Sequence, residues 1–312
     1  MTVLGDSDLD VFPLGLGGNT FGWTSDRDTS FAVLDAFAAA GGNLIDTADS
    51  YSAWAPGNTG GESETIIGEW LAARGNRDSV VVATKVSRHP QFRGLSRGNV
   101  LAAADASLAR LRSGYIDLYY VHYDDPDVPV AEAVGVFGEL QKAGKIRHVG
   151  LSNFTAPRLR EWFAATAAEG IAPPVALQPH YNLVERASYE TSFAPVAAEF
   201  GLGVLPYSGL ASGFLAGKYR RAADHAGAAR QPGATRYLTP AGLGVLAALD
   251  AVAADHGVSP ATVALAWLRT RSGVVAPLAS ARTVEQLPAL LASATLELSP
   301  DETEVLDKAS AA

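Results

Sequence analysis

The chain has 312 residues, of which 48% are hydrophobic and 18% charged, so it can bury a core and general disorder is not expected. Its 33 acidic and 24 basic side chains give a net charge of −9, which argues against a nucleic acid as the main partner. The absence of cysteine excludes disulfides, thiolate metal sites and a cysteine nucleophile. Neither a basic leader with an apolar run nor a window of ~20 apolar residues occurs, so we expect a cytoplasmic protein without a membrane partner.

Short apolar runs alternate with helical patterns along the chain. The first strand is predicted at residues 11–18, where Gly17 and Gly18 let the backbone approach another group closely. The later strands are predicted at residues 44–45, 80–85, 116–121, 147–151, 175–177, 203–206 and 274–278. Helices are predicted at residues 29–41, 62–74, 97–112, 130–143, 188–200 and 260–270, and from about residues 156 and 284.

Eight strands that alternate with helices, without a linker, predict an α/β fold of the (β/α)8 TIM-barrel type, with residues 1–312 as a single domain. An open doubly wound sheet is the structural alternative, and the even spacing of the units favours a closed barrel. Residues 210–239 are predicted as a long irregular loop after the seventh strand, and residues 243–254 as an extra helix. A loop of that length inside a compact domain is usually functional.

Polar side chains gather at the carboxyl ends of the predicted strands, the face on which barrels build active sites. Asp46 ends the second strand, Tyr51 follows it closely, Lys85 ends the third strand, and His122 follows the fourth. A tyrosine has a pKa of about 10 and becomes a better acid beside a cation. We therefore interpret these four residues as a proton-delivery group.

These residues admit two other interpretations. Asp46 and Lys85 alone could be a structural ion pair at the rim of the barrel. A metal site could combine His122 with the carboxylates of Asp124, Asp125 and Asp127. The sequence has no HxH or HExxH spacing and Lys85 would repel the ion, so we expect no metal and assign the three aspartates to a solvated loop.

Seven motifs resemble those of the aldo-keto reductase family in order and spacing. They are DTADSY (46–51), ATK (83–85), DLYYVH (117–122), GLSNF (150–154), LQPHYN (177–182), PYSGLASGFLAGKY (206–219) and ARTVEQL (281–287). The similarity is to the branch that contains bacterial general reductases and potassium-channel β-subunits. It implies a (β/α)8 barrel that reduces an aldehyde or ketone, possibly a keto-sugar, to an alcohol by hydride transfer from NADPH.

The resemblance also implies catalytic roles for four residues. Tyr51 would protonate the carbonyl oxygen as general acid, and Lys85 would lower the pKa of Tyr51 and stabilise its phenolate. Asp46 would hold Lys85 charged and oriented, and His122 would donate a hydrogen bond that aligns the carbonyl.

Cofactor binding is expected from strand ends, because no GxGxxG motif follows the first strand. The resemblance implies that Ser152, Asn153 and Gln178 bind the nicotinamide carboxamide and that Tyr207 stacks on the ring. It places the other expected cofactor contacts at Gly18, Asn19, Thr20, Asp46, Ser208, Leu210, Ser212, Lys218, Ser280, Arg282 and Gln286. Ser208, Leu210 and Ser212 would wrap the pyrophosphate, and Ser280 and Arg282 would bind the adenosine 2′-phosphate, which favours NADPH over NADH.

The chain departs from the family pattern in several positions around this site. Ala289 and Leu290 replace the glutamate and asparagine that often contact the adenosine, Gly209 replaces a common proline, and Ser280 replaces a glycine. The loop 210–239 is basic within an acidic protein, which predicts either a solvated loop or a clasp that attracts phosphate.

Trp23, Trp54, Tyr123 and Phe92 follow strand ends and would either line a substrate pocket or serve as ordinary packing. The sequence selects neither a physiological substrate nor an oligomeric state. An alternative function is a nicotinamide-binding regulatory subunit that senses redox state with little turnover. The complete set of Asp46, Tyr51, Lys85 and His122 favours an enzyme.

Overall fold

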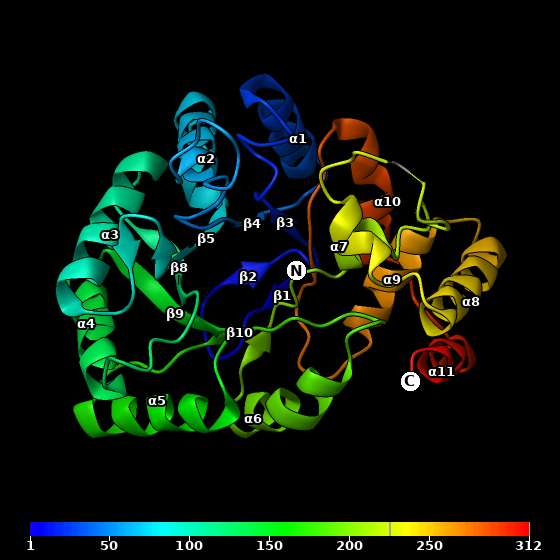
Figure 1. Ribbon diagram of the computed structural model, residues 1–312. Coiled ribbons are helices and arrows are strands. Elements are labelled where there is room, and N and C mark those ends of the chain that lie inside the picture. The colour runs from blue at the N-terminus through cyan, green and yellow to red at the C-terminus, as the bar shows by residue number, and fades with distance from the viewer. Residues whose placement is uncertain (225, 312) are drawn as a thin grey trace.

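The apolar runs pair as parallel strands in a computed structural model that describes residues 1–224 and 226–311 (Figure 1). The strands of this sheet are β3 (Gly15–Gly17), β4 (Leu44–Asp46), β5 (Val81–Val86), β8 (Ile116–Val121), β9 (Ile146–Ser152), β10 (Ala176–Gln178), β11 (Gly203–Val204) and β12 (Leu278–Ala279). They lie in the order β11-β10-β9-β8-β5-β4-β3-β12.

Backbone hydrogen bonds between the two ends of this order close the sheet into a barrel. Val204 N donates to Gly273 O and Val275 N donates to Val204 O, each at 2.9 Å. Leu278 N donates to Pro206 O at the same distance. The predicted (β/α)8 barrel is therefore confirmed, and the open doubly wound sheet is excluded.

Helices surround the barrel in Figure 1 and follow the strands in chain order. They are α1 (Arg27–Ala39), α2 (Glu62–Arg74), α3 (Arg97–Leu111), α4 (Val130–Lys142), α5 (Ala156–Glu169), α6 (Ala194–Glu199), α9 (Pro260–Arg269) and α10 (Leu287–Leu291). Side chains cap several of their first turns, because Asp26, Thr155 and Ser259 accept hydrogen bonds from backbone amides at the starts of α1, α5 and α9.

Prolines explain where the predicted boundaries were wrong. Pro13 interrupts the predicted strand 11–18, so β2 (Asp10–Val11) instead pairs antiparallel with β1 (Thr2–Val3), and only β3 joins the barrel. Pro277 similarly shortens the predicted strand 274–278. The predicted helix 188–200 is a π-helix (Tyr189–Phe193) followed by α6, which begins at Ala194 and has Pro195 in its first turn. The predicted helix from 284 is a 3-10 turn (Val284–Gln286) before α10.

Successive side chains of a strand point alternately into the barrel and outward toward the helices. This alternation separates two apolar cores and determines which way the site residues point. In β5, Val81 and Ala83 belong to the interior cluster, whereas Val82 and Val86 pack outward against the helices. Side chains two residues apart share a face, so Lys85 points into the barrel like Ala83. Leu4, Leu9 and Val11 of the β1–β2 hairpin join the interior cluster and close the amino end of the barrel.

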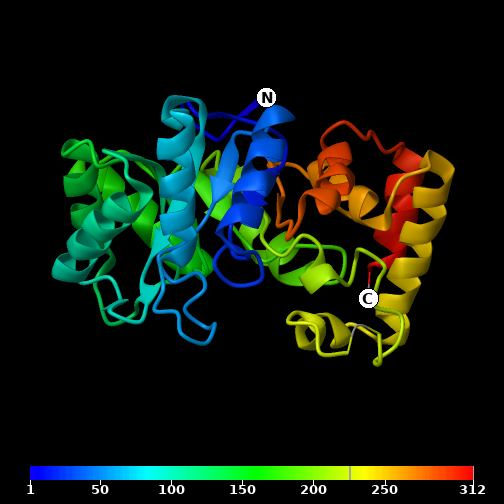
Figure 2. The same ribbon diagram turned by 90° about the horizontal axis from the view of Figure 1, so that it is seen from above.

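The segment 210–239 contains a 3-10 turn (Ala211–Gly213) and α7 (Gln231–Thr235), and the extra helix after it is α8 (Pro240–His256). Figure 2 shows α7 and the chain around it standing apart from the barrel on one side. The shorter elements are the hairpin of β6 (Arg88–His89) and β7 (Phe92–Arg93), α11 (Pro300–Ala309), and 3-10 turns at Arg77–Ser79 and Ala292–Ala294. No single helix within residues 1–224 and 226–311 is long and apolar enough to span a membrane; α8 and α9 meet that test only as a pair bent by 97°.

Candidate active site

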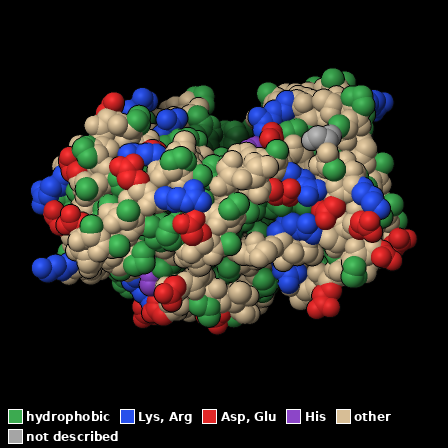
Figure 3. All heavy atoms as spheres, turned by 90° about the horizontal axis from the view of Figure 1, so that it is seen from below, with side chains coloured by type: hydrophobic (Ala, Val, Ile, Leu, Met, Phe, Trp, Pro, Cys, Tyr) green, Lys and Arg blue, Asp and Glu red, His purple; other side chains and the backbone are tan. Residues whose placement is uncertain are grey.

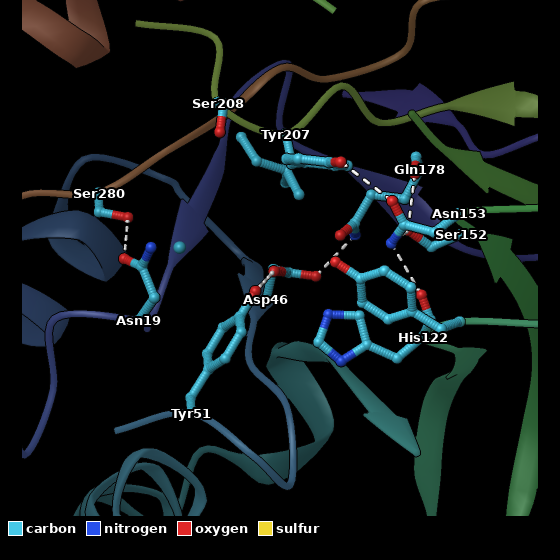
Figure 4. Close-up of a pocket in the computed structure, with 13 residues that line it drawn as sticks. Asn19, Asp46, Tyr51, His122, Ser152, Asn153, Gln178, Tyr207, Ser208 and Ser280 are labelled. Atoms are coloured by element: carbon cyan, nitrogen blue, oxygen red, sulfur yellow. Dashed lines mark hydrogen bonds between the residues drawn. The ribbon is translucent and has the colours of Figure 1, made fainter. Parts of the chain in front are cut away.

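A cavity of about 120 Å³ lies at the carboxyl end of the barrel, where parallel strands bring their last residues together. Side chains from most of the strand ends point into it (Figure 4). Its walls are formed by Gly17, Asn19, Asp46, Tyr51, His122, Tyr123, Ser152, Asn153, Gln178, Tyr207, Ser208, Leu278 and Ser280. Most of the residues predicted from strand ends therefore meet at one place.

Lys85 lies outside the cavity wall and connects two residues of that wall, Asp46 and Tyr51. Its Nζ donates hydrogen bonds to Asp46 Oδ2 and Thr47 O, each at 2.7 Å, and to the Tyr51 hydroxyl at 3.1 Å. The Lys85 side chain is fully buried, and that of Asp46 is 3% exposed. A buried ammonium keeps its charge only when it is paired, so Asp46 is the group that allows Lys85 to stay cationic beside the phenol.

The pKa values of this group differ from the expectation for Tyr51. Burial first, and the charge of Asp46 second, raise the pKa of the Tyr51 hydroxyl well above its ordinary value, so the predicted lowering by Lys85 is not found in the protein alone. Burial lowers the pKa of Lys85, while Asp46 opposes that change. Tyr51 is thus protonated at neutral pH, as a proton donor must be, and Lys85 contacts the oxygen on which negative charge would form.

His122 is half-buried beside Tyr51, with ring centroids 6.1 Å apart. Burial, followed by the positive charges of Lys85 and Arg88, lowers the pKa of His122 well below its ordinary value, so the imidazole is neutral at pH 7. Its Nδ1 has no hydrogen-bond partner among the described residues. A neutral imidazole has one N–H group, so His122 can donate a hydrogen bond to a carbonyl without carrying charge.

A hydrogen-bonded chain of amide and hydroxyl groups forms the opposite wall. Gln178 Nε2 donates to Asp46 Oδ1 at 2.8 Å, and Ser152 Oγ donates to Gln178 O at 2.8 Å. The Tyr207 hydroxyl donates to Asn153 Oδ1 at 3.0 Å, and Asn153 Nδ2 donates to Ser152 Oγ at 3.0 Å. These bonds orient the polar groups that the sequence assigned to the nicotinamide carboxamide.

A groove of about 550 Å³ continues from the cavity beneath the segment 210–239. Figure 3 shows a notch at the upper edge of the molecule with lysine and arginine side chains near its rims. The groove is lined by Asn19, Trp23, Trp54, Ser208, Gly209, Leu210, Ser212, Gly213, Ala216, Lys218, Ala229, Arg230, Gly233, Ser259, Ala261, Leu278, Ala279, Ser280, Arg282, Gln286, Ala289 and Leu290.

Three cations line this groove without an ion-pair partner among the described residues: Lys218, Arg230 and Arg282. Burial first and the charge of Arg282 second lower the pKa of Lys218, and the same two causes lower the pKa of Arg230. Like charges that converge in a groove repel one another, so the arrangement favours a ligand with several negative charges. This donor set fits the pyrophosphate and additional phosphate of a dinucleotide.

Arg230 was not among the predicted site residues. Its Nη2 donates to Asn19 Oδ1 at 2.9 Å, and Ser280 Oγ donates to the same oxygen at 2.7 Å. Asn19 therefore joins the segment 210–239 to the chain after β12, across the groove. The only sequence signal for Arg230 was the basic composition of the loop, which does not distinguish it from the exposed Arg221.

Several predicted positions lie elsewhere than expected. Gly18 and Thr20 are outside the walls of both hollows: Gly18 N donates to Asp46 O at 2.7 Å, and Thr20 Oγ1 donates to Ala281 O at 3.3 Å. Gly17 lines the cavity in place of Gly18, and a Cβ there would lie 2.6 Å from Ser280 Oγ. Glycine at position 17 therefore permits the close approach of β12.

The aromatic residues considered for substrate binding separate into two groups. Trp23 and Trp54 line the groove and contact each other edge to face at 5.5 Å, and Tyr123 lines the cavity. Phe92 lies outside both walls, in β7, and packs against His89 at 5.1 Å, in agreement with the packing alternative.

Two of the three carboxylates near His122, those of Asp124 and Asp125, are bonded to other parts of the protein. Asp124 pairs with Arg158 at 2.8 Å, and Asp125 Oδ2 accepts a hydrogen bond from Leu95 N at 2.9 Å. Within residues 1–224 and 226–311, no group of three or more histidine, aspartate or glutamate side chains is arranged to hold a metal ion.

The sequence of the chain is similar to those of known proteins over nearly its whole length. The sequence profile of the aldo/keto reductase family matches residues 13–311. The protein tas of Escherichia coli is 35% identical over 322 residues, which cover 95% of this chain and 93% of tas. Norsolorinic acid reductase stcV of Emericella nidulans is 34% identical (94% and 76% covered), and the aryl-alcohol dehydrogenase [NADP(+)] of Phanerodontia chrysosporium is 31% identical (96% and 82% covered).

Proposed function

The chain belongs to the aldo/keto reductase family, and from that premise we propose that it reduces an aldehyde or ketone to an alcohol with NADPH. The observation that carries the proposal is the contact of the Lys85 ammonium with both the Tyr51 hydroxyl and Asp46. The oxidoreductase names of the relatives support the same class of reaction, and one of those names specifies NADP(+).

The residues of the cavity would have separate roles in proton transfer and in alignment of the substrate carbonyl. Bound NADPH would supply a hydride to the carbonyl carbon. Tyr51 would give its proton to the carbonyl oxygen, and Lys85 would stabilise the phenolate left behind. His122 would donate a hydrogen bond to the carbonyl oxygen and so hold it near the Tyr51 hydroxyl. The products are then an alcohol and oxidised dinucleotide, with one hydride and one proton added across the carbonyl group.

The groove offers the groups that a phosphorylated dinucleotide requires. Ser152, Asn153 and Gln178 would bind the carboxamide at the cavity end. Lys218 and Arg230 would pair with the pyrophosphate, and Ser280 and Arg282 with the additional phosphate of NADPH. Ala289 and Leu290 line the far end of the groove, so contact with the adenosine there would be apolar.

The test measures the rate at which NADPH is oxidised in the presence of 4-nitrobenzaldehyde, from the loss of absorbance at the nicotinamide band. We expect Tyr51→Phe to lower kcat by about 10²- to 10⁴-fold, the usual contribution of a positioned general acid, with little change in the Kd for NADPH. A Tyr115→Phe variant is the matched control, because this tyrosine lies far from the cavity and bonds Asp78. Full activity of Tyr51→Phe would refute the assignment.

A redox-sensing subunit with little turnover would bind NADPH without oxidising it at a useful rate. The same assay separates the two functions, since the sensor would show a dinucleotide Kd and no aldehyde-dependent rate. The substrate we propose is a small carbonyl compound, and the cytoplasmic location stays a prediction.

A further inference from the structure

A continuous series of aromatic rings runs from the groove into the cavity. The ring of Trp23 contacts Trp54 at 5.5 Å, and Trp54 contacts Tyr51 at 6.1 Å. Tyr51 then contacts His122 at 6.1 Å, and His122 contacts Tyr123 at 5.1 Å. We call these five residues the aromatic arc. Tyr51 lies in its middle, so a substrate that places its carbonyl at Tyr51 meets ring surfaces on both sides.

A guanidinium stands at one end of this arc. Arg88 lies over the ring of Tyr123, with its Cζ 4.4 Å from the ring centroid. The charge of Arg88 also contributes to the lowered pKa of His122, after burial and Lys85, so its field reaches the cavity. An arginine that stacks on an aromatic face has a restricted position while its N–H groups remain available.

The surroundings of Arg88 leave its charge uncompensated. Arg88 forms no ion pair with a carboxylate in the part of the chain that the structure describes, and its cross-strand neighbour in the β6–β7 hairpin is a second cation, Arg93. Like charges directly opposite each other in a hairpin are unfavourable. The aspartates of the loop after β8 form no ion pair with either arginine among the described residues: Asp124 is paired with Arg158, and Asp125 accepts a hydrogen bond from Leu95 N.

We propose that the site selects aromatic carbonyl compounds that carry a carboxylate, with the ring held along the aromatic arc and the carboxylate paired with Arg88. This inference rests on the proposed reductase function and adds the class of substrate. Arg88 acts as a specificity residue: it contacts the far end of the substrate and takes no part in proton transfer. The pair is at the protein surface, so it should be sensitive to salt and modest in strength.

The first test compares two aldehydes whose para substituents differ in charge, 4-carboxybenzaldehyde with a carboxylate and methyl 4-formylbenzoate with a neutral methyl ester. At low ionic strength we expect kcat/KM for the acid to exceed that for the ester by about fivefold, the upper range for an exposed ion pair. In Arg88→Gln the ratio should fall to about one. Lys142→Gln is the control for net charge, because Lys142 is exposed at the end of α4, toward the opposite face of the barrel.

The second test measures binding without turnover. Benzoate and benzamide are titrated into the full chain with NADP⁺, and quenching of tryptophan fluorescence gives the Kd; Trp54→Phe identifies the part of the signal that comes from the arc. We expect benzoate to bind about fivefold more tightly than benzamide in the original chain and equally in Arg88→Gln.

The two measurements separate failure of the inference from failure of the proposed function. Equal kcat/KM for the two aldehydes and equal Kd values for the two ligands would overturn the role of Arg88 while the reductase function stands. If neither aldehyde is reduced, the proposed function fails, and Arg88-dependent binding of benzoate would still support a carboxylate site. Loss of the preference in Arg93→Gln but not in Arg88→Gln would overturn the assignment to Arg88.

Discussion

The cavity and the groove at the mouth of the barrel differ in how their positively charged side chains are paired. At the cavity, Lys85 is fully buried and lies 2.7 Å from the carboxylate of Asp46. In the groove, Lys218, Arg230 and Arg282 converge without a carboxylate partner among the described residues. A buried ion pair stabilises the fold only while both members are present, whereas unpaired cations oppose folding and can be compensated by an anionic ligand. Removal of a charge should therefore have opposite effects in the two places.

The largest effect is expected in the cavity. Lys85→Met leaves the Asp46 carboxylate buried without its cation, and loss of one member of a buried pair typically lowers the free energy of unfolding by about 3–5 kcal/mol. Urea unfolding followed by circular dichroism measures this change. The double variant Asp46→Asn/Lys85→Met should recover part of the loss, because no buried charge remains. A single variant with an unchanged urea midpoint would show that the pair does not stabilise the fold.

A groove variant should show the reverse pattern. Arg230→Gln removes one of three converging cations, so its urea midpoint should be unchanged or higher. Its Kd for NADP⁺ should rise about tenfold, as expected for the loss of one charge-assisted hydrogen bond. Isothermal titration calorimetry at two salt concentrations measures the Kd for NADP⁺ and shows how much of the affinity is electrostatic. Arg221→Gln is the matched control, since Arg221 is on the same segment but 85% exposed and paired with Asp224. An equal loss of affinity in that control would contradict the assignment.

The smallest effect concerns the half-buried imidazole of His122 in the cavity. The pKa of His122 is lowered well below its ordinary 6.5 in the folded chain, chiefly by burial, so the unfolded chain binds a proton first as the pH falls. Stability attributable to His122 is therefore present above pH 6.5 and declines below it. Between pH 7.5 and 6.0 the contribution is about 0.8 kcal/mol if the folded imidazole stays neutral.

Urea midpoints at these two pH values, compared between the original chain and His122→Asn, isolate this contribution from the other histidines. The variant should lose less stability on acidification than the original chain. If both lose the same amount, His122 is not held neutral by the fold.

The barrel could be predicted from the sequence because its strands are short apolar runs separated by strong helix signals. The predicted strands at 80–85 and 116–121 differ from β5 and β8 by at most one residue at either end. The predictions for 11–18 and 274–278 were wrong in their bounds, since Pro13 and Pro277 remove backbone donors within otherwise apolar runs. The β1–β2 hairpin was missed because its strands have only two residues each.

The candidate site likewise contains features that the sequence predicts and others that only the structure reveals. Asp46, Lys85 and His122 were predictable because each ends or follows a strand and shares its inward face with the apolar residue two positions earlier. The raised pKa of Tyr51 was not, since it reflects burial and the proximity of Asp46 to the hydroxyl. The hydrogen bond from Arg230 to Asn19 joins residues 211 positions apart, and no local pattern indicates such a contact.

By itself, the sequence determined the (β/α)8 architecture, the family, and the strand ends at which Asp46, Lys85, His122, Ser152 and Gln178 lie, because these follow from periodicity and from motifs of adjacent residues. The tertiary structure decided which charges are paired, which residues of the basic segment reach the groove, and that Arg88 stacks at the end of the aromatic arc. Those outcomes depend on how far each side chain is buried and on distances between loops from different strands, which local sequence does not encode.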